Sequence, residues 1–577
     1  MTGSESNENV TVNGRTFTAP GPGVWEYEAV HMPRPISPWM AASIGEASAA
    51  GFAFSAKFCG ALVSHLALGV VHGFAFSKIV PVGAPEGAKG PPPKLIFQLL
   101  TRLHPEIRRR IRRSVEVFEK KLWREELKRW DDEVKPRARA RQAALQSLEP
   151  STLDDAGLTA HLEACLQASR DMIYQHHEFT VTCGLPVGDY LAHAAEWTGL
   201  TMGELLQALR GATPVSRGVA AAELDALAAA VRESPDAQAL LQSNLFAGEI
   251  LDALKAQDGE VGRLARAWID LVGCRSIGYD VYDQMNLELP GLLVRALRTT
   301  LEAGTGAAAV DTVATERIRS RVPEAHRDAF DALLAEARLI FRLRDERGVF
   351  SDGWSTGLLR RAVLAVGERL GAQGKLDDAE LILDTTPEEA LAMLRGGAGP
   401  GSAALRERRD FRLTTRLEDV PLSLGGTPSG PPPAEWLPAK GRRAAKAVDA
   451  FIGCVFGTPG HVAPAAAPSV GQALAGTPVS PGTVTGRICL VSGPSEFASI
   501  ERGDILVTAS TSPYFNVVLP MLGGIVTDRG GQLSHAAIVA REYGIPCIVD
   551  TRVATRTLKT GQRARLDGTT GSLTVLT

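Results

Sequence analysis

The feature that most constrains this chain is the segment Gly523–Val549, which packs a strand, a turn and a helix into a short length. Ile525–Thr527 has the apolar, β-branched composition of the end of a buried strand. Ser534 is a favourable N-cap for a helix that would begin at His535, and Gly544 predicts a left-handed cap at its end. Because short β-branched runs and glycine turns alternate through the last hundred or so residues, this unit predicts a C-terminal α/β domain.

The position of His535 at the start of that helix indicates a chemistry. A helix N-terminus presents unpaired backbone amides and the positive end of the helix dipole, which together stabilise phosphate. The glycine pair Gly530–Gly531 lets an anion or a partner domain approach the backbone closely, and Ser534 would help to position the ring. A sterically open imidazole at this place can attack a phosphoryl group and hold it, which splits one transfer into two.

The composition of the whole chain excludes several classes of protein. Its 577 residues carry 62 Lys and Arg against 65 Asp and Glu, a balance that gives no reason to expect nucleic acid or a membrane as a partner. Seven scattered cysteines without a CxxC spacing predict free thiols in a cytoplasmic protein and no metal site. The sequence has no Walker A, Rossmann, HExxH or GxSxG motif.

Composition shifts divide the chain into four predicted regions. The expected boundaries are 1–95 (aromatic, Gly- and Pro-rich), 96–420 (helical in pattern), 421–475 (a Pro/Gly-rich linker) and 476–577 (the α/β domain). Within the linker region, Gly425–Pro433 and Phe456–Gly471 cannot continue a helix. Such a semi-rigid connection would let the C-terminal domain pivot.

The stretch Phe58–Ser77 contains no charged side chain and reaches membrane-spanning length. Its histidines and glycines favour a buried helix that lines a cavity over a membrane span. Together with Trp25, Trp39 and two phenylalanines, this segment is expected to form an apolar ligand pocket.

Residues 476–577 resemble the swivelling phosphohistidine domain of the phosphoenolpyruvate (PEP)-utilising enzymes, a family that includes rifampin phosphotransferase. The matching segments are GTPVSPGTVTGRICLV, GDILVTASTSP, IVTDRGGQLSHAAIVAREYGIPCIV and LKTGQRARLDGTTGSLTVL, in the family's order. The resemblance implies that His535 is the phosphorylated residue. Arg541 belongs to the family's signature but lies on the other side of the helix from His535, which favours a structural role.

The rest of the chain resembles, more weakly, the substrate-binding domain of rifampin phosphotransferase and phenylphosphate synthase-like proteins. The segments that carry this likeness are GVWEYEAVHMPRPISPWM, GCRSIGYDVYDQMNLELPGLL and the helical run 337–378. The fold class expected is therefore a mainly α-helical substrate-binding domain followed by an α/β swivelling domain. No ATP-grasp domain or PEP-binding barrel matches this sequence, so Mg-ATP is expected on a separate ATP-grasp partner and no cofactor is assigned to this chain.

The resemblance implies a phosphotransferase that moves a phosphoryl group from ATP, by way of His535, to a hydroxyl of a small lipophilic or aromatic acceptor. Two alternatives remain open: a ligase-like component that activates a carboxyl or carbonyl group, and a non-enzymatic phosphorelay or binding protein. The residues considered for the acceptor site, each with a structural role as the competing interpretation, are His31, Trp39, His65, His72, Arg275, Asp280 and Glu288. Among them, His31, His65 and His72 are the possible bases for an acceptor hydroxyl.

Overall fold

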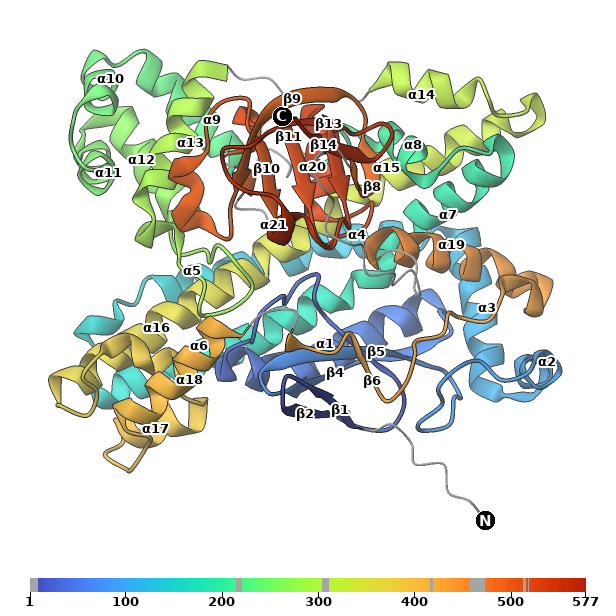
Figure 1. The fold of residues 1–577 in the computed structure, drawn as a ribbon, viewed down its shortest axis with the longest axis horizontal. Coiled ribbons are helices and arrows are strands. Elements are labelled where there is room, and N and C mark those ends of the chain that lie inside the picture. The colour runs from blue at the N-terminus through green and yellow to red at the C-terminus, as the bar shows by residue number, and fades with distance from the viewer. Residues whose placement is uncertain are drawn as a thin grey trace.

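The computed structural model describes residues 9–213, 220–303, 311–415, 419–456, 473–511, 515–516 and 518–576. The chain forms a long helical body, a small sheet built on its N-terminal segments, and a C-terminal domain organised around an eight-stranded sheet (Figure 1). This confirms the expected fold class, a mainly helical region followed by an α/β domain. Among the described residues, no helix combines the length and apolarity needed to cross a bilayer.

The N-terminal sheet has the strand order β4-β5-β3-β6 and is antiparallel throughout. Its strands are β4 (Val63–Val71), β5 (Phe74–Pro81), β3 (Trp25–Tyr27) and β6 (Ser423–Leu424). A separate hairpin joins β1 (Asn9–Val12) to β2 (Arg15–Thr18). Because β6 pairs with β3, a segment from far along the chain completes the sheet that the N-terminal residues begin.

The prediction of a buried helix over Phe58–Ser77 is wrong. Helix α1 (Pro38–Cys59) ends at Gly60, which has a left-handed φ of 71°, and the chain then turns into β4. The two-residue loop His72–Gly73 has φ values of 50° and 80°, the left-handed conformation that reverses a tight hairpin. Valine, leucine and phenylalanine on either side of this loop fit a sheet that is covered by α1, so the absence of charge reflects a covered hairpin.

The helical body is built on α1 and five further long helices. These are α6 (Asp155–Glu178), α7 (Thr180–Thr198), α15 (Arg327–Phe350), α16 (Asp352–Ala372) and α19 (Ala439–Phe456). Helix α1 packs on α6, while α7 packs on both α15 and α19. Helix α19 lies inside the region predicted as a linker, and the second linker candidate falls outside the described residues from 457 to 472.

Smaller helices flank this body. They include α2 (Lys94–Leu103), α3 (Pro105–Lys120), α4 (Trp123–Arg129) and α5 (Lys135–Gln146). Helix α17 (Pro387–Leu394) packs on α16, and Phe411 of α18 (Ser402–Thr414) contacts Phe74 of the N-terminal sheet. A separate group has its own apolar core: α9 (Ala221–Arg232), α10 (Pro235–Gln242), α11 (Ala247–Ala256), α12 (Gly259–Val272) and α13 (Pro290–Ala303). The short α8 (Met202–Leu206) and α14 (Thr312–Arg319) lie near the C-terminal domain (Figure 1).

The C-terminal sheet has the order β7-β14-β13-β9-β10-β11-β12-β8. Its four central strands are parallel: β9 (Thr483–Leu490), β10 (Ile505–Thr508), β11 (Gly524–Thr527) and β12 (Cys547–Val549). The outer strands are antiparallel: β7 (Ala473–Ala475), β8 (Thr477–Ser480), β13 (Arg563–Asp567) and β14 (Ser572–Val575).

Side chains alternate between the two faces of this sheet. Leu506 and Ile525 pack beneath α20 (His535–Tyr543), whereas Val507 and Val526 pack with α21 (Ala554–Thr557) on the other face. The carboxyl ends of β10 and β11 meet at one edge of the sheet, where functional residues of open α/β sheets gather.

Candidate phosphohistidine site

His535 is the first residue of α20, as the sequence predicts. Strand β11 ends at Thr527, a loop follows, and Ser534 caps the helix by accepting a hydrogen bond on its hydroxyl from the backbone N–H of Ala537, at 3.4 Å. At the other end, Gly544 closes α20 with a φ of 66°. The predicted strand–turn–helix unit is therefore confirmed.

Thr511, just beyond the end of β10, contacts the imidazole of His535. The Thr511 hydroxyl oxygen lies 3.0 Å from Nδ1 of His535. When Nδ1–H donates to this oxygen, the lone pair of the ring is left on Nε2, which is buried and makes no hydrogen bond with the described residues. Burial, with the guanidinium of Arg344 nearby, lowers the pKa of His535 to about 3. The imidazole is therefore neutral near pH 7, the form that can attack phosphorus.

Backbone contacts hold the His535 turn against the helical body. The N–H of Leu533 donates to the carbonyl of Cys454 on α19 at 2.8 Å, and Arg344 of α15 donates to the Leu533 carbonyl. A Cβ on Gly531 would lie 2.4 Å from the Cys454 carbonyl oxygen, so only glycine permits this approach. The close backbone approach predicted for the double glycine is thus made by the end of α19.

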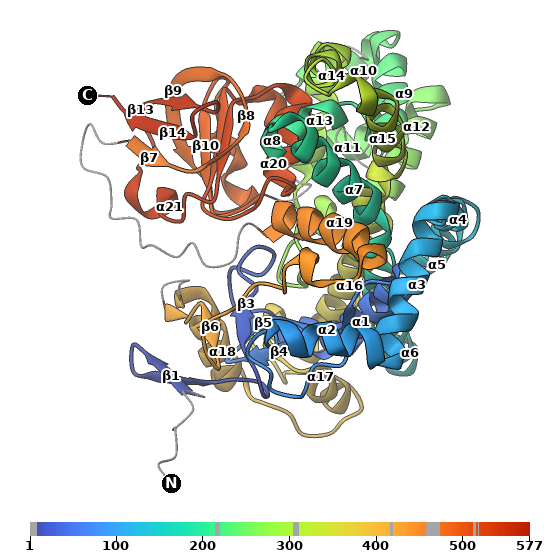
Figure 2. The same cartoon turned by 90° about the vertical axis from the view of Figure 1, so that its right-hand side faces the viewer.

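A cavity of about 1430 Å³ lies between the C-terminal domain and the helical body and has His535 on its wall. Figure 2 shows the two parts facing each other across α19. Much of the wall is apolar, with contributions from Ile44, Phe52, Leu68 and Ile173. Polar and charged side chains also line it, and they come from many segments of the chain that are far apart in sequence.

Two histidine–carboxylate pairs contribute to the cavity wall. Nδ1 of His31 lies 2.9 Å from Oε1 of Glu28, and the His31 ring meets Tyr279 edge-on at 5.8 Å. Although burial alone would raise it, hydrogen bonds with His31 and Ser77 hold the pKa of Glu28 below its ordinary value. Glu28 is therefore ionised and orients the His31 ring.

In the second pair, Nδ1 of His176 lies 2.6 Å from Oδ2 of Asp352. Burial lowers the pKa of His176 well below its ordinary value, and Arg347 acts in the same direction. Burial raises the pKa of Asp352 well above its usual range. Both shifts favour the uncharged forms, so this pair is less suited than Glu28 and His31 to receive a proton.

The structure separates the seven acceptor-site candidates. His31 and Arg275 line the cavity; Arg275 donates to the Leu271 carbonyl at 2.6 Å and lies 4.5 Å from the Trp354 ring centre. The other five described side chains do not line it. They are Trp39, buried in the apolar core between α1, α6 and α16; His65, beside Ser64; His72, whose Nε2 contacts the Thr16 carbonyl oxygen; Asp280, which accepts from the Ser37 N–H; and Glu288, which is paired with Arg360.

Several residues of the site were not singled out from the sequence: Glu28, Thr511, Arg529, Arg344, His176 and Asp352. Glu28 could have been found from the sequence, because it lies three residues before the candidate His31 in the segment GVWEYEAVHMPRPISPWM. Thr511 had a weaker signal, since it lies in GDILVTASTSP, one of the segments that match the family. Arg541 makes its hydrogen bonds with the carbonyls of Val479 and Gln532, in agreement with a structural role.

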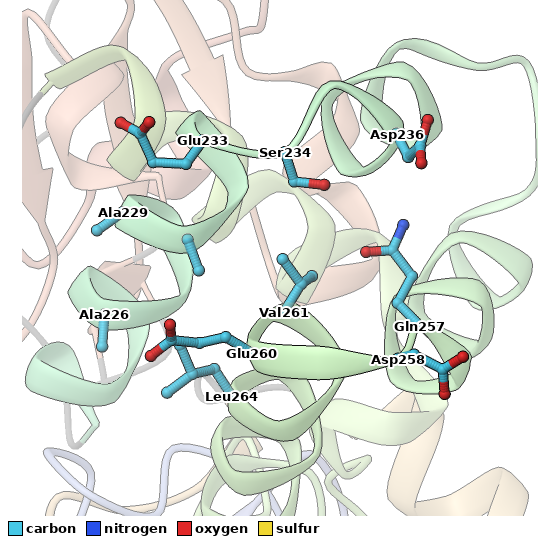
Figure 3. A pocket seen from close by; sticks show the side chains of 11 residues that line it. Ala226, Ala229, Glu233, Ser234, Asp236, Gln257, Asp258, Glu260, Val261 and Leu264 are labelled. Atoms are coloured by element: carbon cyan, nitrogen blue, oxygen red, sulfur yellow. The ribbon is translucent and has the colours of Figure 1, made fainter.

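A second hollow, of about 760 Å³, lies between α9, the α10–α11 region and α12 (Figure 3). Its side chains are small, apolar or acidic, such as Ala226, Val261, Glu233 and Glu260. No lysine, arginine or histidine lines it among the described residues, so it does not offer a phosphate site.

A comparison with protein-family models matches the part of the chain that contains the His535 unit. The family model of the PEP-utilising enzyme mobile domain matches residues 500–571. Residues 500–571 are therefore similar to the mobile domain of the PEP-utilising enzymes, in agreement with the resemblance seen in the sequence.

Individual relatives extend the match. The chain is 48% identical to the phosphoenolpyruvate synthase of Pyrococcus furiosus over 98 residues, and this match covers 17% of the chain and 12% of the relative. It is 30% identical to a rifampicin phosphotransferase of a Streptomyces species over 375 residues, and this match covers 61% of the chain and 39% of the relative. An uncharacterized phosphotransferase of Bacillus subtilis is 30% identical over 241 residues, 41% of this chain and 26% of the relative. The chain thus spans only 12% to 39% of the length of these relatives.

Proposed function

We propose that this protein is a phosphotransferase in which His535 carries a phosphoryl group from a nucleotide, bound by a separate ATP-grasp protein, to a hydroxyl of a small lipophilic or aromatic acceptor. The observation that carries the proposal is the position of His535 on the wall of a large, mainly apolar cavity. Thr511 holds Nδ1, so the lone pair on Nε2 is the one available for transfer.

The donor step requires the C-terminal domain to leave the position described above. Nε2 of His535 is buried in this arrangement, and a nucleotide bound to another protein would have to reach it. Outside it, Nε2 attacks the phosphorus atom, a P–O bond of the nucleotide breaks and a P–N bond forms. Besides the backbone contacts and Arg344, buried Leu533 packs in the apolar core of the helical body, so this movement would have to expose an apolar side chain.

The acceptor step takes place when the phosphorylated domain returns. The acceptor oxygen attacks phosphorus, the P–N bond breaks and Nε2 regains its lone pair. Nε2 of His31 receives the hydroxyl proton, because ionised Glu28 fixes Nδ1 of His31 as the donor side. Arg529, whose Nε makes no hydrogen bond with the described residues, lies on the same wall beside Gly530 and supplies positive charge for the moving group.

The test begins with β- or γ-labelled ATP, candidate ATP-grasp proteins and the purified chain. We expect acid-labile, base-stable label on His535 only when a partner is present, and none on the His535→Ala variant. Thr511→Val should incorporate label roughly 10–100-fold more slowly, because the tautomer is no longer fixed, while Thr511→Ser keeps the contact. Absence of label from every nucleotide and from PEP would contradict the proposal.

A second variant separates the two steps. His31→Gln leaves the His535 site intact, so labelling should proceed at the wild-type rate. Transfer from labelled protein to an acceptor alcohol should fall by about 10²–10⁴-fold, because the proton acceptor is gone. Equal loss of labelling and transfer would show that His31 supports the fold and does not accept the proton.

A further inference from the structure

Helix α2 exposes an apolar face that no described residue covers. Leu95, Ile96, Leu99 and Leu103 are 79%, 51%, 56% and 65% exposed. Leu95, Leu99 and Leu103 recur every four residues and therefore share one face of the helix. Figure 1 shows α2 at one edge of the molecule, away from the C-terminal domain.

The opposite face of α2 anchors it to the protein. Phe97 and Leu100 pack against a small core formed by Ile107, Ile111 and Leu437, and Thr101 is buried. The ring of Phe97 also lies 6.1 Å from that of Trp436. Because α2 is apolar on both faces, the outward leucines are not needed to hold the helix in place.

Positive charge is concentrated in the sequence on either side of α2. Residues 84–113 contain eight lysines and arginines but only two acidic residues, Glu86 and Glu106. Glu106 is engaged by Arg109 and Arg110 of its own helix. Besides Arg109, the exposed cations of this stretch are Lys89, Lys94, Arg102, Arg108 and Arg112.

The large cavity opens to solvent beside this face. Ile96, Phe97 and Leu100 of α2 line the cavity, and so does the exposed segment Lys89–Pro91. On the other side of the opening, Ser429 donates to the carbonyl of Lys89 at 3.0 Å. The exposed leucines are thus continuous, through Ile96, with the apolar wall of the cavity.

We infer that α2 docks this protein on a membrane surface that carries anionic lipids. The leucine face would enter the acyl boundary while the surrounding cations contact headgroups, the arrangement of interfacial amphipathic helices. A second copy of the chain fits poorly, because two such cationic rims would repel each other. A protein partner would not explain why the leucine face continues into the apolar wall of the cavity. A bilayer would explain it, because a lipophilic acceptor could pass from the bilayer into the cavity. This entry of the acceptor rests on the proposed function, whereas the docking itself does not.

The test is co-sedimentation of the full chain with phosphatidylcholine vesicles, with and without phosphatidylglycerol. We expect binding only to the anionic vesicles, and release at high salt because the headgroup attraction is screened. Leu95→Ser/Leu99→Ser should weaken binding at least ten-fold, and Arg102→Ser about five-fold. The matched control is Leu245→Ser/Phe246→Ser, an exposed apolar pair (45% and 82%) between α10 and α11, at the opposite end of the molecule; it should bind as the wild type does.

The proposal is overturned if the wild-type chain does not bind anionic vesicles, or if both double variants lose binding equally. It is also overturned if Leu95→Ser/Leu99→Ser keeps vesicle binding but loses labelling by an ATP-grasp protein, since α2 would then be a protein interface. Vesicle binding is measured without nucleotide and with His535→Ala as well as wild type. Its failure and the failure of phosphotransfer can therefore be told apart.

Discussion

At the scale of single residues, burial decides which charge states are stable while the C-terminal domain lies against the helical body. His535 is neutral because it is buried beside Arg344. Glu542, also on α20, accepts the backbone N–H of Gly211 with both carboxylate oxygens, at 3.0 and 2.9 Å. Burial raises the pKa of Glu542 to about 7, from a usual value of 4.5. This carboxyl therefore makes the contact between α20 and the helical body sensitive to pH.

Replacing Glu542 by Gln tests that sensitivity. Between pH 4.5 and 7 the folded protein holds a proton on Glu542 that the unfolded chain has lost, so the free energy of unfolding falls as pH rises through 7. Glu542→Gln, which cannot ionise, should raise the free energy of unfolding at pH 8 by on the order of 2 kcal/mol and change it little near pH 4.5. Denaturant unfolding at the two pH values measures this, with the exposed Glu324→Gln as control. An equal effect at both pH values would refute it.

At the scale of elements, the crossing of α7 and α19 sets the shape of the site, because α19 provides the carbonyl that holds the His535 turn. The two helices approach closely at glycines of α7. A Cβ on Gly188 would lie 1.9 Å from the carbonyl oxygen of Ala447, and one on Gly184 would lie 2.3 Å from the Phe451 ring. Neither the pattern of α7 nor that of α19 alone predicts this crossing.

Gly188→Ala should lower the free energy of unfolding by about 1–3 kcal/mol, because the added methyl overpacks a backbone contact. Gly453→Ala on α19 is the matched control: nothing lies within 4 Å of its added Cβ, so the change should be neutral or slightly stabilising. Thermal or denaturant unfolding distinguishes the two. If Gly188→Ala is as stable as Gly453→Ala, the close helix crossing is not a determinant of stability.

At the scale of the whole molecule, the proposed function requires two positions of the C-terminal domain. The described arrangement places His535 on the cavity wall, which suits delivery to an acceptor, whereas a donor bound to another protein would need the domain to move. The contact between Gly531 and the end of α19 is tight enough for a single methyl group to disturb it.

Gly531→Ala should therefore shift the protein toward the detached arrangement. Small-angle scattering should show a larger radius of gyration, while label incorporation from a donor protein is retained or faster and transfer to an acceptor is slower. Gly493→Ala, in the same domain with nothing within 4 Å of the added Cβ, should match the wild type. An unchanged radius of gyration with normal transfer would argue against this contact as the docking point.

The sequence by itself determined the local units and singled out His535 as the residue proposed to react. The helix beginning at His535, its Ser534 and Gly544 caps and the preceding strand follow from short-range preferences, and a local motif carries the family resemblance. Phe58–Ser77 was misassigned because an apolar run alone does not distinguish a covered hairpin from a buried helix; the left-handed His72–Gly73 turn decided between them. The balanced charge of the whole chain likewise gave no indication of the local excess of lysine and arginine in residues 84–113.

Only the tertiary structure decided which side chains share the cavity with His535. Glu28, His176, Arg344 and Thr511 come from four distant segments and meet His535 around one cavity. The same folding placed Trp39, His65 and His72 elsewhere, although their residue types suit a binding site equally well. Local patterns depend on neighbours in sequence, whereas a cavity wall, a shifted pKa and a fixed tautomer depend on neighbours in space, which are set only when helices and sheets pack.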